Sequence, residues 1–525
     1  MSEDLTPLVK SELGAILGKR IGLSGPTSPF QFQSRNVLDK FILSDVIIQR
    51  PGSYVADLVF SNCSFIKEVA VGDAQRARRI VFENCKFFAP VSIDSTENCI
   101  LLGKNEFFEQ CKIGLGRARP LENIIAHKDL EITAEYPTLG LAKICNINQE
   151  TTNLEPSMVI RVTNGMLHFE NVYLGKVFCS TQNVSTVTIV QSEMQSFEMA
   201  FGGPMTFASE NSKIGKLNTT SLCGAGGKIE LSDSRFRELT IEDSDFKRLD
   251  IIGGTIHNLL LCGVLEKDKY VTVSSVELNE LLFKNFYNNG VLSFRDVCIK
   301  EHGNFEIANS TLGKTDFIGC HFREALFVFL NSKLTEIFVA ETEFPTTVAG
   351  IDKRRFEQAQ LAFGQFRTAF DKQGDAVRAL EYQSREIEAH YQTIPSFWTR
   401  RFPFVELTKL NLGLNKVSNN FGREWGRALV FSLAIGIFFF VTLLCSTKPS
   451  TSANTLPRGG VILISFFRFM NPLRFFDLET LFIIDGQSAY VKVTAASYAM
   501  DFLGRIGLAY GYYQTIQAFR RFGRK

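Results

Sequence analysis

The sequence predicts a β-solenoid followed by a helical hairpin and an α-helical transmembrane domain. Three observations predict this fold class. Large apolar residues recur every five positions through much of residues 35–345, apolar residues return at helical spacing after residue 347, and residues 428–445 contain no charge. A period of five fits neither a helix nor an alternating strand, whereas the other two patterns are typical of helices.

The period of five is clearest after Arg235. It runs through Phe236, Ile241, Phe246, Ile251, Ile256 and Leu261, and it returns in residues 174–199 and 312–327. Earlier it is partial, in the phrases SNCSF, ENCKF and EQCKI. Such a repeat predicts a right-handed coil with four short faces, in which each face turns one apolar residue inward and roughly twenty residues complete a turn.

This repeat resembles that of the pentapeptide-repeat proteins and covers about residues 35–347. The family's usual A-(D/N)-L-x-x motif is almost absent and insertions interrupt the array, so we expect longer and less regular strands than the family has. A different β-helix is the alternative fold. Residues 1–34 are expected to supply a cap, with an amphipathic helix over residues 5–17, because a repeat array needs a closed end.

Charge and cysteine content indicate a cytosolic front domain. From Lys353 onward there are 23 Lys and Arg against 12 Asp and Glu, a net charge of +11, whereas residues 1–352 carry −9. The opening Met-Ser-Glu-Asp lacks the apolar core of a signal peptide. The 11 cysteines form no C-x-x-C pair, so we interpret them as small buried residues and not as disulfides.

Residues 348–424 are expected to form a helical hairpin and linker. Apolar residues at helical spacing predict helices over 353–371 and 375–391, separated at Gly374, with Asp375 as the N-cap of the second. Their charged residues are interpreted as a solvated or subunit-facing surface.

Residues 425–525 are expected to form the transmembrane domain. The uncharged run predicts a first span over about 427–446, long enough at about 27 Å to cross the hydrocarbon layer. A buried helix of a soluble domain is the alternative. Residues 457–485 hold too short an apolar run to span, and they predict either a re-entrant segment or an interfacial helix.

A second span is expected over about 495–518, although it carries two charges. Ser497, Asp501 and Arg505 lie on one stripe of this helix, with the two charges spaced to pair. The stripe is interpreted either as the lining of a water-filled pore or as a buried salt bridge between helices. Gly504, Gly507 and Gly511 form a second stripe, which predicts close helix packing.

Four phrases of the carboxyl-terminal region occur in an order that resembles bacterial membrane-anchored pentapeptide-repeat proteins. They begin at Phe366, Leu414, Met470 and Phe502. The layout of those proteins is similar to that of small ion channels. The resemblance implies a multi-pass protein of the bacterial inner membrane, with the front domain and the carboxyl terminus in the cytoplasm.

Two basic stretches interrupt the acidic front domain. One contains Arg76, Arg78 and Arg79, and the other contains Lys112, Arg117 and Arg119. Guanidinium groups on the loops of a rigid scaffold can hold phosphates. These residues are candidates for binding an anionic nucleotide or nucleic-acid ligand, and a solvated turn is the alternative interpretation.

No catalytic or metal-binding motif is present in the sequence, so we expect neither an enzyme nor a cofactor. The first hypothesis is a homo-oligomeric channel in membrane lipid, with a tetramer favoured, gated by the solenoid. This layout is similar to membrane effectors of bacterial anti-phage systems. The second hypothesis is a membrane-tethered scaffold that binds a cytosolic protein partner, and the third is a soluble mimic of DNA.

Overall fold

The computed structural model divides the chain into two units, Met1–Thr347 and Val348–Lys525. The described residues are 6–8, 30–33, 35–37, 41–42, 58–71, 80–93, 99–102, 104–108, 110–114, 121–122, 124–126, 130–134, 141–145, 147–149, 157–200, 206–219, 226–242, 246–348, 353–394, 407–449, 459–471, 473, 478–482 and 491–522.

The described part of the first unit is built of parallel strands. They are β1 (Thr6–Leu8), β2 (Phe30–Gln33), β3 (Arg35–Val37), β4 (Phe41–Ile42), β5 (Leu58–Ser61), β6 (Ser64–Phe65), β7 (Val69–Val71), β8 (Ile80–Glu83), β9 (Lys86–Phe87), β10 (Val91–Ile93), β11 (Cys99–Leu102), β12 (Asn105–Phe107), β13 (Cys111–Gly114), β14 (Leu121–Glu122), β15 (Ile124–Ala126), β16 (Leu130–Ala134), β17 (Leu141–Cys145), β18 (Asn148–Gln149), β19 (Ser157–Glu170), β20 (Tyr173–Val190), β21 (Glu193–Ala200), β22 (Thr206–Glu210), β23 (Lys213–Asn218), β24 (Lys228–Ser232), β25 (Arg235–Glu242), β26 (Arg248–Ile252), β27 (Thr255–Leu265), β28 (Tyr270–Ser274), β29 (Glu277–Asn288), β30 (Val291–Arg295), β31 (Cys298–Ala308), β32 (Thr311–Ile318), β33 (Leu326–Leu330), β34 (Lys333–Ala340) and β35 (Thr347–Val348).

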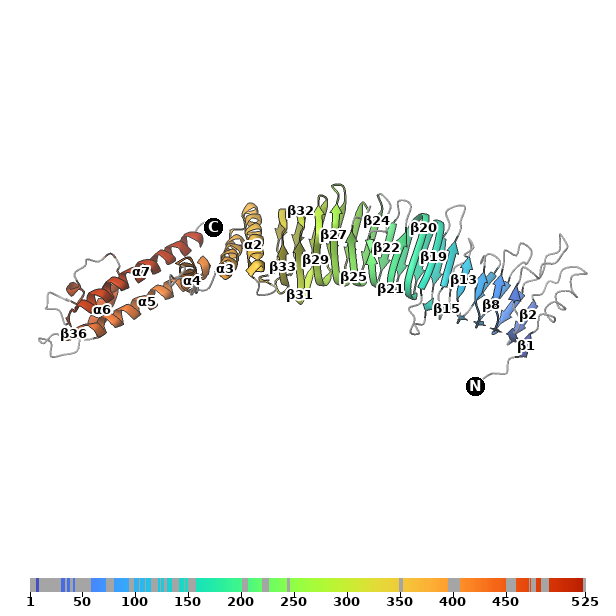
Figure 1. Ribbon diagram of the computed structural model, residues 1–525, viewed down its shortest axis with the longest axis horizontal. Helices are drawn as coiled ribbons and strands as arrows, with labels where there is room; N and C mark the ends of the chain where they lie inside the picture. The colour runs from blue at the N-terminus through green and yellow to red at the C-terminus, as the bar shows by residue number, and fades with distance from the viewer. Residues whose placement is uncertain are drawn as a thin grey trace, which may run out of the picture. The chain divides into compact units, whose positions relative to one another are not determined.

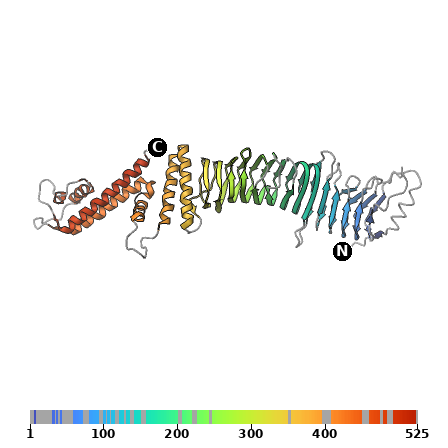
Figure 2. The same cartoon turned by 45° about the horizontal axis from the view of Figure 1, so that its top comes forward.

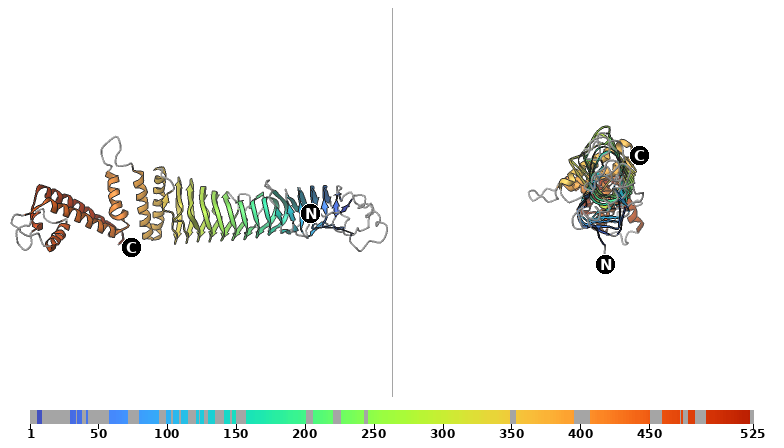
Figure 3. Two further views of the ribbon diagram at one scale, coloured as in Figure 1. Left: turned by 90° about the horizontal axis from the view of Figure 1, so that it is seen from below. Right: turned by 90° about the vertical axis from the view of Figure 1, so that its right-hand side faces the viewer.

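These strands stack into a β-solenoid of about 9 turns, which confirms the β-solenoid of the expected fold class (Figure 1). Each strand pairs with the equivalent strand one coil further along the chain. One such ladder joins Lys228 to Arg248, Tyr270 and Val291, so a coil takes about twenty residues, as the period of five predicts. Figure 3 shows the strands of successive coils side by side.

The residues of the five-residue period form the core. Phe236, Ile241, Phe246, Ile251, Ile256 and Leu261 are all at most 4% exposed. Rings also stack from coil to coil, with centroids 4.8 Å apart for Phe65 and Phe87 and 4.7 Å apart for Phe87 and Phe107. Full burial of such side chains contributes about 1.5–3 kcal/mol each, so the ladder of large residues is what holds the coils together.

The strands are longer than a coil with four short faces would have, as the missing family motif led us to expect. In residues 228–308 a five-residue strand alternates with a long one, such as the 12-residue β29. A long strand bends where its ladder omits one residue. β21 and β23, for example, pair at Met194 and again at Ser196, so the ladder skips Gln195 and Gly215 without a change of register.

A left-handed corner recurs along the solenoid. Asn62, Asn84, Asn171 and Asn211 have φ angles of 47–53°, and Gly253 occupies the equivalent position with φ 69°. Asparagine and glycine tolerate this conformation best among the common residues. The corner therefore explains the asparagine in the phrases SNCSF and ENCKF.

At several corners a small residue follows the left-handed position and faces the core. Ser192, Ser212 and Ser234 are at most 3% exposed. The Ser192 hydroxyl accepts a hydrogen bond from the Val172 amide at 3.2 Å, and the Ser212 hydroxyl accepts one from the Ser192 amide at 3.2 Å. Each hydroxyl thereby satisfies a buried backbone amide of the preceding coil.

The amino end differs from the expected cap helix. Thr6–Leu8 forms strand β1, which pairs in parallel with β3. The helix expected over residues 5–17 is therefore wrong for these three residues, because pairing with the next coil competes with the local helical pattern. Residues 9–17 lie outside the described residues.

The cysteines of the solenoid are mostly buried and none of the described ones forms a disulfide. Cys63, Cys85, Cys99, Cys111, Cys179 and Cys320 lie in the core, whereas Cys298 is exposed. Burial raises the pKa of the Cys320 thiol to about 11, so this thiol stays protonated and unreactive at neutral pH.

The second unit is helical, with one short antiparallel strand pair. Its elements are α2 (Lys353–Gln373), α3 (Ala376–Thr393), α4 (Leu407–Asn419), the 3-10 helix η3 (Asn420–Gly422), α5 (Trp425–Ser446), β36 (Lys448–Pro449), α6 (Gly459–Met470), the 3-10 helix η4 (Glu479–Phe482), β37 (Val491–Lys492) and α7 (Ala495–Phe522).

Helices α2 and α3 form the expected hairpin. The Asp375 carboxylate accepts a hydrogen bond from the Arg378 amide at 3.0 Å and so caps α3, as predicted. Gly374 has φ 79°, a conformation that favours glycine. Phe370 stacks on Tyr382 with ring centroids 5.3 Å apart, and Arg367 pairs with Glu386 at 2.8 Å.

Helices α5 and α7 lie side by side (Figure 2), and α6 packs against them. Within the described residues, α5 is the one helix long and apolar enough to cross a membrane by length and composition. α6 has 12 residues, about 18 Å, and is too short to span. A hydrophobic cluster joins the three helices, with Phe440, Phe469 and Leu508 at its centre.

Candidate functional site in the helical unit

The predicted glycine stripe of α7 lies against α5. A Cβ atom on Gly511 would lie 2.5 Å from Ser432 Oγ, and one on Gly507 would lie 2.9 Å from Ile435 Cγ2. On Gly504 it would lie 2.7 Å from Phe469 Cζ of α6. None of these contacts leaves room for a side chain, so glycine allows the helices to approach closely.

α5 contributes a matching face of small residues. Ala428, Ser432 and Gly436 are spaced four apart and are all buried. The Ser432 hydroxyl donates to the Ala428 carbonyl oxygen at 2.9 Å and lies 3.5 Å from the Thr515 hydroxyl. The interface between α5 and α7 is thus close-packed and carries internally satisfied hydroxyl groups. This contribution of α5 was not foreseen from the sequence.

The predicted polar stripe of α7 is buried inside the helical unit. Ser497 is fully buried, Asp501 is 3% exposed and Arg505 is 8% exposed. Arg505 Nε donates to Asp501 Oδ2 at 2.9 Å, one helical turn apart. In the single chain the two charges thus form a buried salt bridge within α7, and not one between helices.

Ser497 belongs to a hydroxyl cluster at one end of the helix pair. Its hydroxyl accepts from Ser446 Oγ at 3.1 Å and donates to the Ser446 carbonyl oxygen at 3.2 Å. Thr494 Oγ1 donates to that same carbonyl at 2.9 Å, and the Thr494 amide donates to Ser497 Oγ at 3.2 Å. The Ser497 amide returns a bond to Thr494 Oγ1 at 3.2 Å. This reciprocal cap starts α7 and ties it to the last turn of α5.

The outward faces of α5 and α7 are apolar. On α7 every exposed residue between Tyr498 and Phe519 is uncharged, because the two charges in that stretch are the buried Asp501 and Arg505. That stretch is about 32 Å long. The exposed large residues are Trp425, Leu429, Val430, Leu433, Ile437, Phe438 and Val441 on α5, and Tyr498, Phe502, Leu503, Ile506, Tyr513, Ile516 and Phe519 on α7.

An elbow of left-handed residues joins α4 to α5. Asn420, Phe421 and Gly422 have φ angles of 50°, 55° and 88°. Left-handed backbone is costly for phenylalanine, and Phe421 is only 2% exposed, so burial of its ring offsets that strain. Asn419 Oδ1 accepts from the Gly422 amide at 2.9 Å and caps the turn.

The elbow contacts both the hairpin and α7. Asn419 Nδ2 donates to Gln514 Oε1 at 2.6 Å, and both side chains are buried. From the hairpin side, Glu381 of α3 pairs with Arg423 at 3.3 Å, and Glu388 pairs with Lys416 at 3.0 Å. Glu381 and Glu388 thus link α3 to α4 and to the elbow, and both side chains remain partly exposed, as a solvated or subunit-facing surface would be.

The basic candidates of the front domain do not converge on a site in the described residues. Arg76, Arg78, Arg79, Arg117 and Arg119 lie outside those residues. Lys112 is described. It pairs with Glu131 at 2.7 Å, and Glu131 also contacts Arg161 at 2.8 Å.

These three side chains sit on β13, β16 and β19, three strands that lie next to one another in the ladder. Lys112 therefore takes part in a cross-strand ion-pair ladder. Its hydrogen bond, together with the charges of Lys112 and Arg161, holds the pKa of the Glu131 carboxyl below its usual value.

No group of three or more His, Cys, Asp and Glu side chains in the described ranges is arranged to hold a metal ion. Comparisons with protein-family models, with curated proteins and with solved structures found no match to the chain.

Proposed function

We propose that the chain is one subunit of an oligomeric ion channel of the bacterial inner membrane, gated by the cytosolic solenoid. The observation that carries the proposal is the helical unit itself, whose outward faces are apolar while an Asp–Arg pair is enclosed within. A soluble core helix is buried on all sides, whereas only 28% of the most apolar stretch of α5 is buried.

α7 is proposed as the second span. Its composition includes two charges, and each would cost about 2.5–3.5 kcal/mol at the bilayer centre if it faced lipid. Pairing and burial of Asp501 and Arg505 remove both from the lipid-facing surface. The exposed face that remains is uncharged and about as long as the hydrocarbon layer is thick.

The proposed topology puts the start of α5 and the end of α7 on the cytoplasmic side. Trp425 at the start of α5 contacts Phe519 near the end of α7, with ring centroids 5.0 Å apart. At the opposite end of the two helices, the antiparallel strands β36 and β37 pair through their backbones, with Lys448 across from Lys492. Arg423 and Arg427 precede α5 and four basic residues close the sequence, a distribution that the positive-inside rule assigns to the cytoplasm.

Two spans cannot enclose a pore, so the proposed channel is a homo-oligomer, with a tetramer as the first expectation. The buried Asp501–Arg505 pair is then its closed arrangement, and opening brings the polar stripe to a shared water-filled axis. The elbow offers a route for gating because it is bonded to α3 through Arg423 and to α7 through Asn419. An equilibrium between two such arrangements is what a gate requires.

A membrane-tethered scaffold is the second candidate. The observation that favours it is the burial of the same stripe inside a single chain, because an internal salt bridge also serves to hold a helical anchor together. In that case the solenoid would bind a cytosolic protein along its side, and no current would cross the membrane.

The channel is tested by replacing both charges, Asp501→Leu with Arg505→Leu. Removing the pair together avoids leaving one charge buried alone. We expect the variant to insert into membranes as the wild type does, while the conductance of purified protein in planar bilayers falls at least tenfold. The matched control, Phe502→Leu with Ile506→Leu, alters the exposed face of the same helix turn and should leave conductance within twofold. Unchanged current in the charge variant contradicts the pore.

A further inference from the structure

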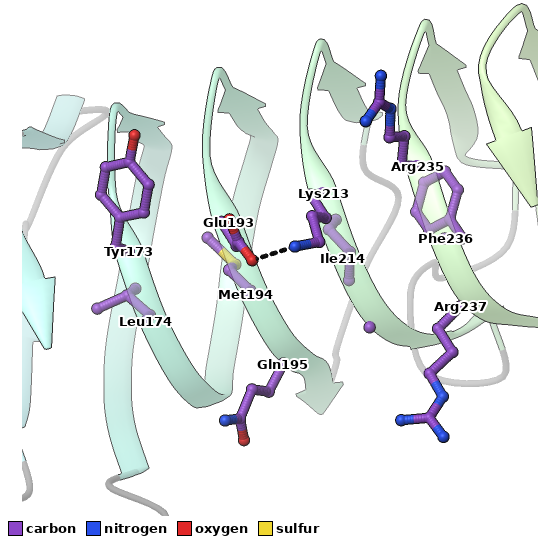
Figure 4. A pocket seen from close by; sticks show the side chains of 11 residues that line it. Tyr173, Leu174, Glu193, Met194, Gln195, Lys213, Ile214, Arg235, Phe236 and Arg237 are labelled. Atoms are coloured by element: carbon purple, nitrogen blue, oxygen red, sulfur yellow. Dashed lines mark hydrogen bonds and ion pairs between the residues drawn. The ribbon is translucent and has the colours of Figure 1, made fainter. Parts of the chain in front are cut away.

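A groove on the outer surface of the solenoid, far in sequence from the helical unit, has the features of a ligand site (Figure 4). Its volume is about 470 Å³, within the range of small-molecule pockets. It crosses four coils, and its walls include Tyr173, Glu193, Lys213, Arg235 and Arg237.

Gly215 opens the groove. It lies at the position that the ladder pairing skips, as do Gln195 and Arg237 on the neighbouring strands, and these two side chains point to the same side of the sheet in Figure 4. A Cβ atom on Gly215 would lie 2.2 Å from the Gln195 carbonyl oxygen, so no side chain fits there. Beneath the gap lie the side chains of Met194 and Ile214, which are 2% and 0% exposed and belong to the solenoid core.

Two arginines make the groove attract anions. Arg235 and Arg237 are both exposed, and neither forms an ion pair with any residue that the structure describes. Lys213 is paired with Glu193 at 2.5 Å. The walls named above therefore carry a net charge of +2, and guanidinium groups bind phosphate oxygens through two parallel hydrogen bonds.

The side chains along the groove follow one another in an order that suits some anions better than others. The ladder register joins Tyr173 to Glu193, Glu193 to Lys213 and Lys213 to Arg235. Adjacent coils are about 4.8 Å apart, so Tyr173 and Arg235 are separated by roughly 14 Å. The sequence of groups is thus aromatic ring, carboxylate, ammonium and guanidinium at even spacing.

We propose that this groove binds a nucleoside 5′-diphosphate. The base stacks on the Tyr173 ring, which is 55% exposed. The Glu193 carboxylate accepts hydrogen bonds from the ribose hydroxyls, a common role for an acidic residue. Lys213 contacts the first phosphate, and Arg235 holds the terminal one, while the Arg237 guanidinium extends to the opposite side of the groove and adds positive charge there. If the chain is the proposed channel, this ligand is its regulator; the binding itself does not depend on that function.

Binding is tested on the full-length protein in detergent by titration calorimetry with adenosine 5′-diphosphate and with inorganic pyrophosphate. Arg235→Gln with Arg237→Gln should weaken both ligands at least tenfold, because the variant loses charge-assisted hydrogen bonds to phosphate and the positive charge of the groove. The matched control, Lys314→Gln with Arg323→Gln, removes two charges elsewhere on the solenoid and should leave both affinities within twofold.

Tyr173→Ala separates the nucleotide from a simple anion. It should weaken adenosine diphosphate about tenfold and leave pyrophosphate unchanged. Equal affinity of the wild type for the two ligands would overturn the nucleoside assignment. Absence of binding at millimolar ligand, or binding that the arginine variant retains, would overturn the site. Neither result bears on conductance, so failure here is distinguishable from failure of the channel.

Discussion

The asparagines at the solenoid corners show how one residue type sets the path of the chain. Asn84 and Asn211 adopt left-handed backbone, and the residue that follows each turns into the core. A sequence pattern could have located these corners. It is Asn, Asp or Gly, followed at the next position by a small residue and at the third position by a large apolar residue. The five-residue spacing identified the large residue but not the conformation before it.

Glu131 provides a pH-dependent prediction. Its folded-state pKa is depressed, chiefly by the hydrogen bond from Lys112. The stability that it contributes is therefore complete above pH 4.5, the ordinary pKa, and is lost as the pH falls through the lowered value. At pH 7, Glu131→Gln should lower the free energy of unfolding by less than about 1 kcal/mol, so its thermal midpoint should lie slightly below that of the wild type. In acid the two midpoints should be equal.

Thermal unfolding of the purified chain, followed by circular dichroism between pH 3 and 7, measures this effect. Glu336→Gln serves as the control, because Glu336 is exposed and forms no ion pair with a described residue. A difference between E131Q and the wild type that persists unchanged at the lowest pH would contradict the role given to the ion pair.

Helix α7 shows what a helical pattern can and cannot predict. The spacing of Ser497, Asp501 and Arg505 placed them on one stripe, and the three glycines on another, as the structure has them. The direction that each stripe faces depends on α5 and α6, whose small and aromatic residues decide which side of α7 is covered. Periodicity within one helix carries no information on that choice.

The glycine contacts predict a large effect from a side chain at Gly511. Gly511→Leu must push α7 away from Ser432, whose Cα would lie 3.2 Å from the added Cβ. We expect a loss of about 1–3 kcal/mol in stability, seen as a lower thermal midpoint in detergent. Ala509→Leu places the same side chain on the exposed face of α7 and should change the midpoint little. Equal effects of the two variants would argue against close packing of α5 on α7.

The elbow predicts coupling between Asn419 and Gln514. Gln514→Leu leaves the buried Asn419 amide without its partner and should cost about 1–3 kcal/mol. Asn419→Leu should cost more, since it also removes the cap on Gly422. In a double-mutant cycle of thermal unfolding, the double variant should lose less than the sum of the single losses. Additive losses would show that the two side chains do not stabilise each other.

Across the whole chain, the core of the solenoid, the hairpin and the long apolar helix could be predicted from the sequence. Each of these depends on a residue pattern repeated within one segment, as with Phe236 and the residues that follow it. The elbow and the surface groove could not, because each joins residues that only the fold brings together. Gln514 is 95 positions from Asn419. Tyr173 and Arg235 are brought to the same groove by three successive steps of ladder pairing.

The ladder of equivalent strands makes the solenoid modular. Thr255 pairs with Arg235 on one side and with Glu277 on the other. Excision of residues 255–276 would bring Glu277 next to Arg235 with inward and outward side chains still matched. The array can thus be shortened or extended by whole coils, in steps of about 4.8 Å. Evolution or protein engineering can therefore change the length of the solenoid without changing its cross-section.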